Sequence, residues 1–165
     1  RARSRPTFAY GALYTGSQDG TVYALDAKTG CARWTFKTNA EVRTPVMVQA
    51  MADAKGGAPR AFFGDILGRV YAVDATTGKE LWRAKMDDHP SVTVTGSPVY
   101  HRGRLYVPVS SLEEAATDDK YPCCTFRGSV VALDASSGRQ LWKTYSIEEA
   151  PQRVGTRKNG VAVFA

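Results

Sequence analysis

The sequence lacks long apolar runs, since no stretch in its 165 residues approaches the roughly 18 residues of a membrane-spanning helix. It also lacks local concentrations of glycine and proline, because its 15 Gly and eight Pro are scattered along the chain. These absences exclude a helical membrane span, a collagen-like chain and a low-complexity chain. Hydrophobic residues make up 43% and charged residues 23%, which is ordinary for a folded globular domain.

Cysteine is scarce as well. The three cysteines, Cys31, Cys123 and Cys124, do not have the CxxC spacing of metal sites, and no CxxCH motif for covalent haem attachment occurs. The segment Arg1–Tyr10 lacks the apolar core of a secretory signal peptide. Because the chain begins on a short basic stretch followed directly by a strand-like segment, we expect an internal piece of a longer protein.

Charge of one sign is not concentrated along most of the chain. Lys and Arg number 22 against 16 Asp and Glu, which gives a formal net charge of +6. Basic residues cluster only at Arg1, Arg3 and Arg5 and in the stretch Arg153–Lys158, and elsewhere they alternate with acidic residues. This pattern favours a solvated surface, and we expect no nucleic-acid partner.

Three segments of the sequence are almost alike: Gly20–Trp34, Gly68–Trp82 and Gly128–Trp142. Each has a glycine, a β-rich run, an Asp, two residues, Thr or Ser, Gly, and then Trp four residues later. The tryptophans are 48 and 60 residues apart, so the second interval contains about 12 extra residues. A repeat of this length is typical of a structural unit that stacks on its neighbours.

The turn within each repeat has a simple structural explanation. The Asp carboxylate can accept backbone N–H groups across the turn, and the Gly can supply the positive φ that closes it. A tryptophan that recurs once per unit is most simply a core residue that interlocks neighbouring units. We therefore interpret the repeated acids as structural rather than catalytic; they are Asp26, Asp74 and Asp134.

Further strands complete each repeat. The expected strands are Thr44–Gln49 and Ala61–Asp65 in the second unit, and Ser97–His101 and Arg104–Ser110 in the third; Ala32–Lys37, Glu80–Lys85 and Gln140–Tyr145 carry the tryptophans. Four strands in about 48 residues indicate a β-propeller blade. Only Ser111–Ala116 is expected to form a short turn of helix.

The sequence thus predicts an all-β fold, a partial β-propeller of about three four-stranded antiparallel blades with Trp-docking repeats. Blade 1 spans about 6–38, blade 2 about 42–86 and blade 3 about 95–146, and a fourth blade begins at about 160–165. Because propellers usually close with about four to eight blades, residues 1–165 are interpreted as a fragment of a single propeller.

The repeated ALDAxTGxxxW pattern resembles the quinoprotein repeat of pyrroloquinoline quinone (PQQ) dehydrogenases, and the resemblance covers essentially the whole chain. The adjacent Cys123 and Cys124 strengthen it, because in alcohol-oxidising quinoproteins a disulfide between neighbouring cysteines packs against the quinone ring. The segment Tyr121–Gly128 looks most like members of the polyvinyl-alcohol-dehydrogenase type.

This resemblance implies a PQQ- and Ca²⁺-dependent alcohol dehydrogenase that oxidises alcohols, polyvinyl alcohol among them, and passes electrons to a cytochrome c. In the family, Ca²⁺ polarises the quinone as a Lewis acid and an Asp takes the alcohol proton. The Ca²⁺ ligands and this Asp lie largely on later blades. We therefore expect both outside this chain, and we expect the chain by itself to be inactive.

Loops of the predicted propeller should form a functional face. Loops that join second to third strands open on the same face as the blade-to-blade loops, and long loops on a rigid ring commonly carry function. The 12-residue excess, which includes the cysteine pair, lies between Ser110 and Ser129. The blade-to-blade loops expected on this mouth face are Thr38–Arg43, Met86–Thr95 and Ser146–Asn159.

Candidate cofactor-binding residues on the mouth are Cys123, Cys124, Arg127 and Arg43. The resemblance places an Arg just after the cysteine pair, against a carboxylate and a quinone oxygen of PQQ, and Arg127 is the nearest match. Arg43 begins an innermost strand, where a planar guanidinium can clamp a carboxylate. The alternative role of each arginine is a surface charge.

Asp88 and His89 are the candidate catalytic residues, since with Asp87 they form the one cluster of acids and histidine. Their alternative role is to cap the turn before Pro90. No metal ligand is assigned within the chain.

The cysteine pair has alternatives of its own. Neighbouring Cα atoms across a trans peptide are about 3.8 Å apart, whereas a relaxed disulfide prefers roughly 4.4–6.8 Å. The pair can therefore be two reduced thiols, or one cysteine can pair with Cys31. A persistent disulfide would indicate an oxidising compartment, periplasmic or secreted.

Two other functions are compatible with the repeat. One is a non-catalytic propeller that acts as a protein-binding scaffold, and the other is a quinoprotein that oxidises sugars or polyols.

Overall fold

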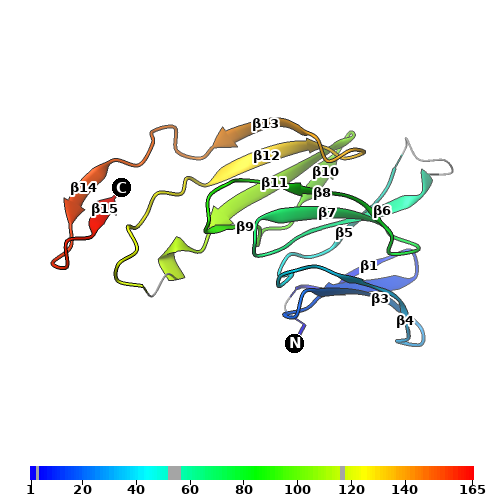
Figure 1. Ribbon diagram of the computed structural model, residues 1–165. Helices are drawn as coiled ribbons and strands as arrows, with labels where there is room; N and C mark the ends of the chain where they lie inside the picture. Colours follow the sequence, from blue (N-terminus) through cyan, green and yellow to red (C-terminus); the bar gives the residue numbers. More distant parts are fainter. Residues whose placement is uncertain (3, 52–56, 116–117) are drawn as a thin grey trace.

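The computed structural model describes residues 1–2, 4–51, 57–115 and 118–165 (Figure 1). Arg3 of the N-terminal basic cluster and Ala116 of the expected helical turn lie outside these residues. Within the described ranges the strands form successive antiparallel sheets, and the turn of helix is the 3-10 helix Glu113–Ala115. The all-β prediction is confirmed.

The sheets follow one another along the chain, and each sheet pairs its strands in sequence order. The first contains β1 (Thr7–Ala9), β2 (Ala12–Gly16), β3 (Thr21–Asp26) and β4 (Ala32–Lys37). The second contains β5 (Met47–Ala50), β6 (Pro59–Gly64), β7 (Arg69–Asp74) and β8 (Glu80–Lys85). The third contains β10 (Val99–His101), β11 (Arg104–Ser111), β12 (Ser129–Asp134) and β13 (Gln140–Tyr145), and β9 (Val92–Thr93) pairs with the end of β11.

The second sheet shows why the strands begin where they do. Strand β5 starts at Met47, not at Thr44 as expected. The Thr44 hydroxyl is buried and accepts the N–H of Gly64 at 2.9 Å, and Pro45 has no N–H to donate to a ladder. The sheet therefore begins after the proline, although the chain already runs beside β6 at Thr44.

The last part of the chain differs from the prediction. Residues 146–159 were expected to be a loop, but β14 (Arg153–Thr156) lies within them and pairs with β15 (Ala162–Phe164). The turn contains Asn159 and Gly160, and Gly160 has a φ of +86°. An Asn-Gly pair between strand-forming residues is a hairpin signal, so this hairpin could have been predicted from the sequence.

The repeated turn forms as predicted in all three sheets. The Asp26 carboxylate accepts the N–H groups of Lys28 and Thr29 at 3.0 Å, and Asp74 and Asp134 make the equivalent bonds. The turn glycines have φ values near +74°: +75° at Gly30, +74° at Gly78 and +73° at Gly138. The carboxylate and the glycine thus close the same turn three times.

Tryptophan docking holds consecutive sheets together. The Trp34 indole donates to Ala75 O at 2.9 Å, and the Trp82 indole donates to Ala135 O at 3.1 Å. Each ring lies on the turn glycine of the next sheet, because a Cβ at Gly78 or Gly138 would come within 2.8 or 2.6 Å of it. Both indoles are 9% exposed, so the interlocking role predicted for them is confirmed.

The core lies between the sheets. One apolar cluster joins the first and second sheets and another joins the second and third. Strand β7 serves both, because Tyr71 and Val73 point to the first cluster while Val70 and Ala72 point to the other. The middle sheet is therefore buried on both faces, which gives the loops a rigid base.

On the mouth face the start of each blade-to-blade connection is hydrogen-bonded to the loop between the second and third strands of the same blade. Thr38 N donates to Gly20 O at 2.8 Å, Met86 N to Gly68 O at 2.9 Å and Ser146 N to Gly128 O at 2.8 Å. The two classes of loop therefore share one face, as predicted. In the part of the chain that the structure describes, no helix is long and apolar enough to cross a membrane.

Candidate functional site

The long loop between β11 and β12 carries the cysteine pair and lies beside the β14–β15 hairpin (Figure 1). Cys123 O accepts the N–H of Phe164 at 2.9 Å, and Cys124 N donates to Phe164 O at 3.5 Å. Four residues before Cys123 in the same loop, Asp119 O accepts the side-chain amide of Asn159 at 2.8 Å. The β14–β15 hairpin, which was not predicted from the sequence, therefore supports one side of the cysteine segment.

The two cysteines are joined through their sulfur atoms. The peptide between them is cis and their Cα atoms are 3.0 Å apart, whereas the sequence argument assumed the trans spacing. Cys31 is a free, exposed cysteine in the β3–β4 turn, so the alternative pairing with Cys31 is wrong. The cysteine pair is half-buried.

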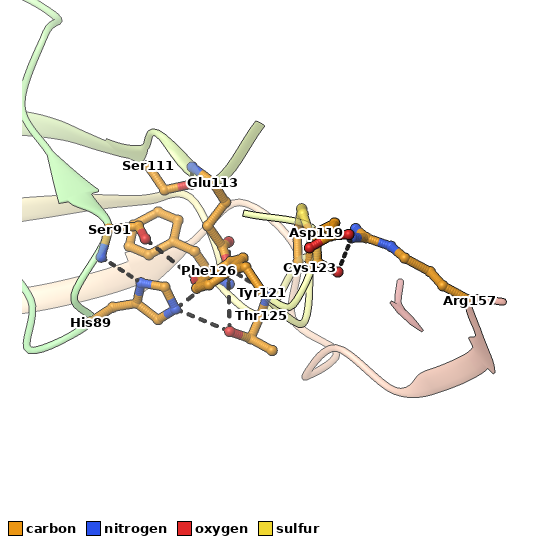
Figure 2. Close-up of a disulfide and its surroundings, with 11 residues drawn as sticks. His89, Ser91, Ser111, Glu113, Asp119, Tyr121, Cys123, Thr125, Phe126 and Arg157 are labelled. Carbon is orange, nitrogen blue, oxygen red and sulfur yellow. Dashed lines mark hydrogen bonds and ion pairs between the residues drawn. A yellow bond between two sulfur atoms is a disulfide. The ribbon is translucent and has the colours of Figure 1, made fainter. Parts of the chain in front are cut away.

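Glu113 lies behind this segment and is 3% exposed (Figure 2). One of its carboxylate oxygens accepts the N–H of Thr125 at 2.9 Å and the hydroxyl of Tyr121 at 2.9 Å, and the other accepts the N–H of Phe126 at 2.8 Å. Burial raises the pKa of the Glu113 carboxyl, but these hydrogen bonds outweigh it, so the pKa lies below its ordinary value. Glu113 is thus an ionised carboxylate held inside the loop.

His89 belongs to the same cluster. Its Nδ1 accepts the N–H of Ser91 at 3.2 Å, so in the neutral ring Nε2 carries the proton and donates to Thr125 Oγ1 at 3.0 Å. The ring stands edge-on to Phe126, with ring centres 5.3 Å apart. His89 therefore packs against the cysteine loop from the side of the β8–β9 connection (Figure 2).

The two acids before His89 have different surroundings. Asp87 accepts the N–H of His89 at 2.8 Å, as a turn cap would, and pairs with Lys143 on β13. Burial raises the pKa of Asp87, but the Lys143 ammonium and the hydrogen bonds lower it further than burial raises it. The Asp88 side chain is exposed and forms a 3.4 Å ion pair with Lys85.

A cavity of about 240 Å³ opens beside the cysteine pair. Its lining comprises Cys124, Phe126, Arg127, Gly128, Ile147, Glu149, Ala150, Pro151, Phe164 and Ala165. The Arg127 guanidinium lies 3.7 Å from the centre of the Tyr145 ring and donates to Glu148 O at 2.6 Å. The wall is thus largely apolar, with a cation held in a defined position.

The structure therefore brings together only part of the predicted site. Cys124 and Arg127 line the same cavity, whereas the other predicted site residues do not line it: Cys123, Arg43, Asp88 and His89. Arg43 forms a 2.9 Å ion pair with Glu41 in the β4–β5 connection. The roles of all these residues in binding or catalysis stay predictions.

Sequence reasoning missed Glu113 and Phe164. Glu113 is followed by Glu114 in the same short helix, and nothing in the local sequence separates a buried acid from its exposed neighbour. Phe164 contacts the cysteine segment across some 40 residues of chain, a distance that no local pattern encodes.

Docked repeats of four antiparallel strands, with a cavity and long loops on one face, define a β-propeller of the quinoprotein type. The family model described as outer membrane protein assembly factor BamB matches residues 1–154. The chain therefore belongs to this family of PQQ-type propeller repeats, and its sheets are propeller blades.

Similar proteins narrow the relationship to quinoprotein alcohol dehydrogenases. The chain is 46% identical over 149 residues to a polyvinylalcohol dehydrogenase from Pseudomonas sp, and 42% identical over 149 residues to one from Sphingopyxis sp. (strain 113P3). Each alignment covers 90% of this chain and 23% of the relative, so the chain spans about a quarter of the length of these relatives.

A solved structure agrees with the sequence comparison. The quinohemoprotein alcohol dehydrogenase from Comamonas testosteroni superimposes with a TM-score of 0.67 at 25% sequence identity. The match covers 89% of this chain and 21% of that chain. The predicted resemblance to quinoprotein alcohol dehydrogenases is confirmed.

Proposed function

We propose that the chain forms part of the PQQ-binding face of an alcohol dehydrogenase whose substrates include polyvinyl alcohol. The observation that carries the proposal is the cavity shared by Cys124 and Arg127, in a chain 46% identical to a polyvinylalcohol dehydrogenase. Neither the cavity nor the identity would support the proposal alone, because related propellers include an assembly factor.

The residues that line the cavity fit a planar, anionic quinone. Cys124 of the half-buried cysteine pair offers a polarisable surface with little conformational freedom, and Phe126 and Phe164 supply apolar area beside it. Arg127 offers several N–H donors in a plane, which suits a carboxylate. Glu149 also lines the cavity, so we expect the carboxylates of the quinone to lie on the side of Arg127.

PQQ, when bound, would accept the electrons that leave the alcohol. The task of this chain would then be to bind and orient: Cys124 and the aromatic rings would limit the tilt of the quinone, and Arg127 would neutralise a carboxylate. Ile147 and Pro151 help to exclude water from the same wall. Within the described residues no group of three or more His, Cys, Asp or Glu is placed to hold a metal ion, and we propose that Ca²⁺ is bound by other parts of the protein.

The remaining parts of the proposal follow from this chemistry. We propose that the electrons pass to a cytochrome c, as in the family, and that the protein works in the periplasm or outside the cell. An oxidising compartment would keep the disulfide between Cys123 and Cys124 formed.

The test uses the full-length protein with PQQ and Ca²⁺ added, and it measures alcohol-dependent dye reduction with polyvinyl alcohol and with short alcohols. We expect activity that requires PQQ, together with thiol titration that detects Cys31 but neither Cys123 nor Cys124 unless a reductant is added. Absence of activity together with two further titratable thiols would reject the proposal. That result would favour a protein-binding scaffold instead.

A further inference from the structure

We infer that Glu113 is the positioning residue of the cysteine segment, an inference that rests on the proposed function. Its buried carboxylate binds residues on both sides of Cys123 and Cys124 and so holds the pair against the cavity. Glu113 does not itself line the cavity and is not a catalytic residue.

The residues that donate hydrogen bonds to Glu113 lie on both sides of the cysteine pair in the sequence. Tyr121, two residues before Cys123, donates its hydroxyl, and Thr125 and Phe126, one and two residues after Cys124, donate their backbone N–H groups. One carboxylate therefore fixes both ends of a six-residue segment. Hydrogen bonds to a charged acceptor are about twice as strong as neutral ones, so this contact is strong for its size.

The segment is held from two opposite sides. Glu113 binds it from within the third blade, while the backbone of Phe164 on β15 binds Cys123 and Cys124 from the hairpin side. Phe126, Cys124 and Phe164 all line the cavity. Loss of the Glu113 contacts would therefore move the wall of the cavity, whereas the docked sheets of the core would keep their contacts.

The charge of Glu113 is stabilised by the hydrogen-bond donors around it. His89 Nε2 lies 3.6 Å from the carboxylate and the Tyr121 hydroxyl donates to it. The two backbone N–H groups supply most of the stabilisation that water would otherwise give. An amide in place of the carboxylate would keep the shape but lose the charge, and it would place an NH₂ group against one of these N–H donors.

The closing experiment uses the full-length protein with Glu113→Gln and Glu113→Asp, and with Glu114→Gln as the matched control. Glu114 is the exposed neighbour of Glu113 on the same short helix, so its substitution changes the net charge equally. Three quantities are measured: the rate at which dithiothreitol reduces the cysteine pair, followed by alkylation and mass spectrometry; PQQ affinity by titration; and the thermal midpoint of unfolding.

For Glu113→Gln we expect reduction about tenfold faster and PQQ affinity about tenfold weaker, since each hydrogen bond to a charged group contributes on that scale. The thermal midpoint is expected to match that of the control to within a few degrees. Glu113→Asp keeps the charge but is one methylene shorter, so we expect an intermediate effect. This variant also serves as the test if Glu113→Gln does not fold.

The outcomes separate the two proposals. Equal reduction rates in Glu113→Gln and Glu114→Gln would overturn the positioning role, as would a faster reduction that only follows a large fall in the thermal midpoint. Faster reduction in Glu113→Gln, with no PQQ binding by the wild-type protein, would support positioning of the cysteine pair and reject the proposed function.

Discussion

Carboxylates accept backbone N–H groups on both faces of the molecule, and on the mouth face one of them binds N–H groups much farther along the chain. On the turn face Asp26, Asp74 and Asp134 each bind N–H groups two and three residues ahead. On the mouth face Glu113 binds N–H groups 12 and 13 residues ahead. The same chemical group thus closes a local turn in one region and a long loop in the other.

The difference teaches how a repeat protein can carry a single specialised site. A bond across two or three residues depends on the local sequence, so every copy of the repeat forms the same turn. Closing a loop of a dozen residues costs more chain entropy, and its geometry depends on what packs around it. The turn face is therefore repeated in each blade, whereas the mouth face can differ from blade to blade.

The largest expected effect is a loss of stability on the turn face, where a docked tryptophan is removed. Trp82→Ala removes an indole that docks on Gly138 and donates to Ala135, and we expect it to lower the free energy of unfolding by about 3–5 kcal/mol. Leu81→Ala is the matched control, because Leu81 is the neighbour of Trp82 on β8 and is 44% exposed, and about 1 kcal/mol is expected for it. Urea denaturation of both variants measures the difference, and equal losses would contradict the docking argument.

A smaller effect on the same face distinguishes the free-energy cost of backbone strain from the cost of crowding the docked indole. Gly138→Ala places a Cβ at positive φ and 2.6 Å from the Trp82 indole, so the two costs add to about 3 kcal/mol. Gly103→Ala, in the β10–β11 turn, has a similar φ of +79° but meets nothing within 4 Å, and about 1 kcal/mol is expected. The measurement is again the free energy of unfolding. Similar values for the two variants would show that the Trp82 indole can move aside without loss of stability.

On the mouth face the expected change is in binding rather than in stability. Arg127→Ala removes the cation from the cavity wall and is expected to weaken PQQ binding about tenfold or more. Arg139→Ala, an exposed arginine beside the repeated turn, is the control and should leave binding unchanged. Titration of the full-length protein with PQQ measures both, and equal affinities would remove Arg127 from the site.

The smallest effect is a pH dependence of the turn face. Hydrogen bonds from the Ser136 hydroxyl and its neighbours lower the pKa of Asp134 to about 2. Because the folded pKa lies below the unfolded one, this stabilisation is complete above about pH 4 and is lost as the pH falls towards 2. The free energy of unfolding of the wild-type protein should therefore fall over this range more steeply than that of Asp134→Asn.

A carboxylate on the mouth face contributes to the same pH dependence of stability. The pKa of Glu113 is lowered as well, so Glu113 adds to the same acid-induced loss in the wild-type protein. Parallel curves for the wild-type protein and Asp134→Asn would assign the loss to carboxylates other than Asp134.

Much of the fold could be predicted because its determinants recur. The Asp, Gly and Trp of each repeat stand at fixed spacing, and the strands that carry the tryptophans have the predicted bounds. The mouth position of the cysteine pair also follows from blade topology. The start of β5 could not be placed as well, because the buried Thr44 hydroxyl and Pro45 replace the first ladder bonds.

The candidate site was less predictable. Cys124 and Arg127 are close in sequence, so their common cavity needed only a short loop. The sequence makes His89 a catalytic candidate but does not indicate that its ring packs on Phe126, a contact across 37 residues. It makes Arg43 a cofactor-binding candidate but does not indicate the ion pair with Glu41.

The sequence by itself determined the repeat, the turns, the docked tryptophans and the face on which the cysteines lie, because these features recur at the same position of every repeat or follow from the order of its strands. Only the tertiary structure decided that Glu113 is buried while Glu114 is exposed, and that the β14–β15 hairpin supports the cysteine pair. The physical reason is that a buried charge is stabilised by whichever donors surround it in space, and these donors come from distant parts of the chain.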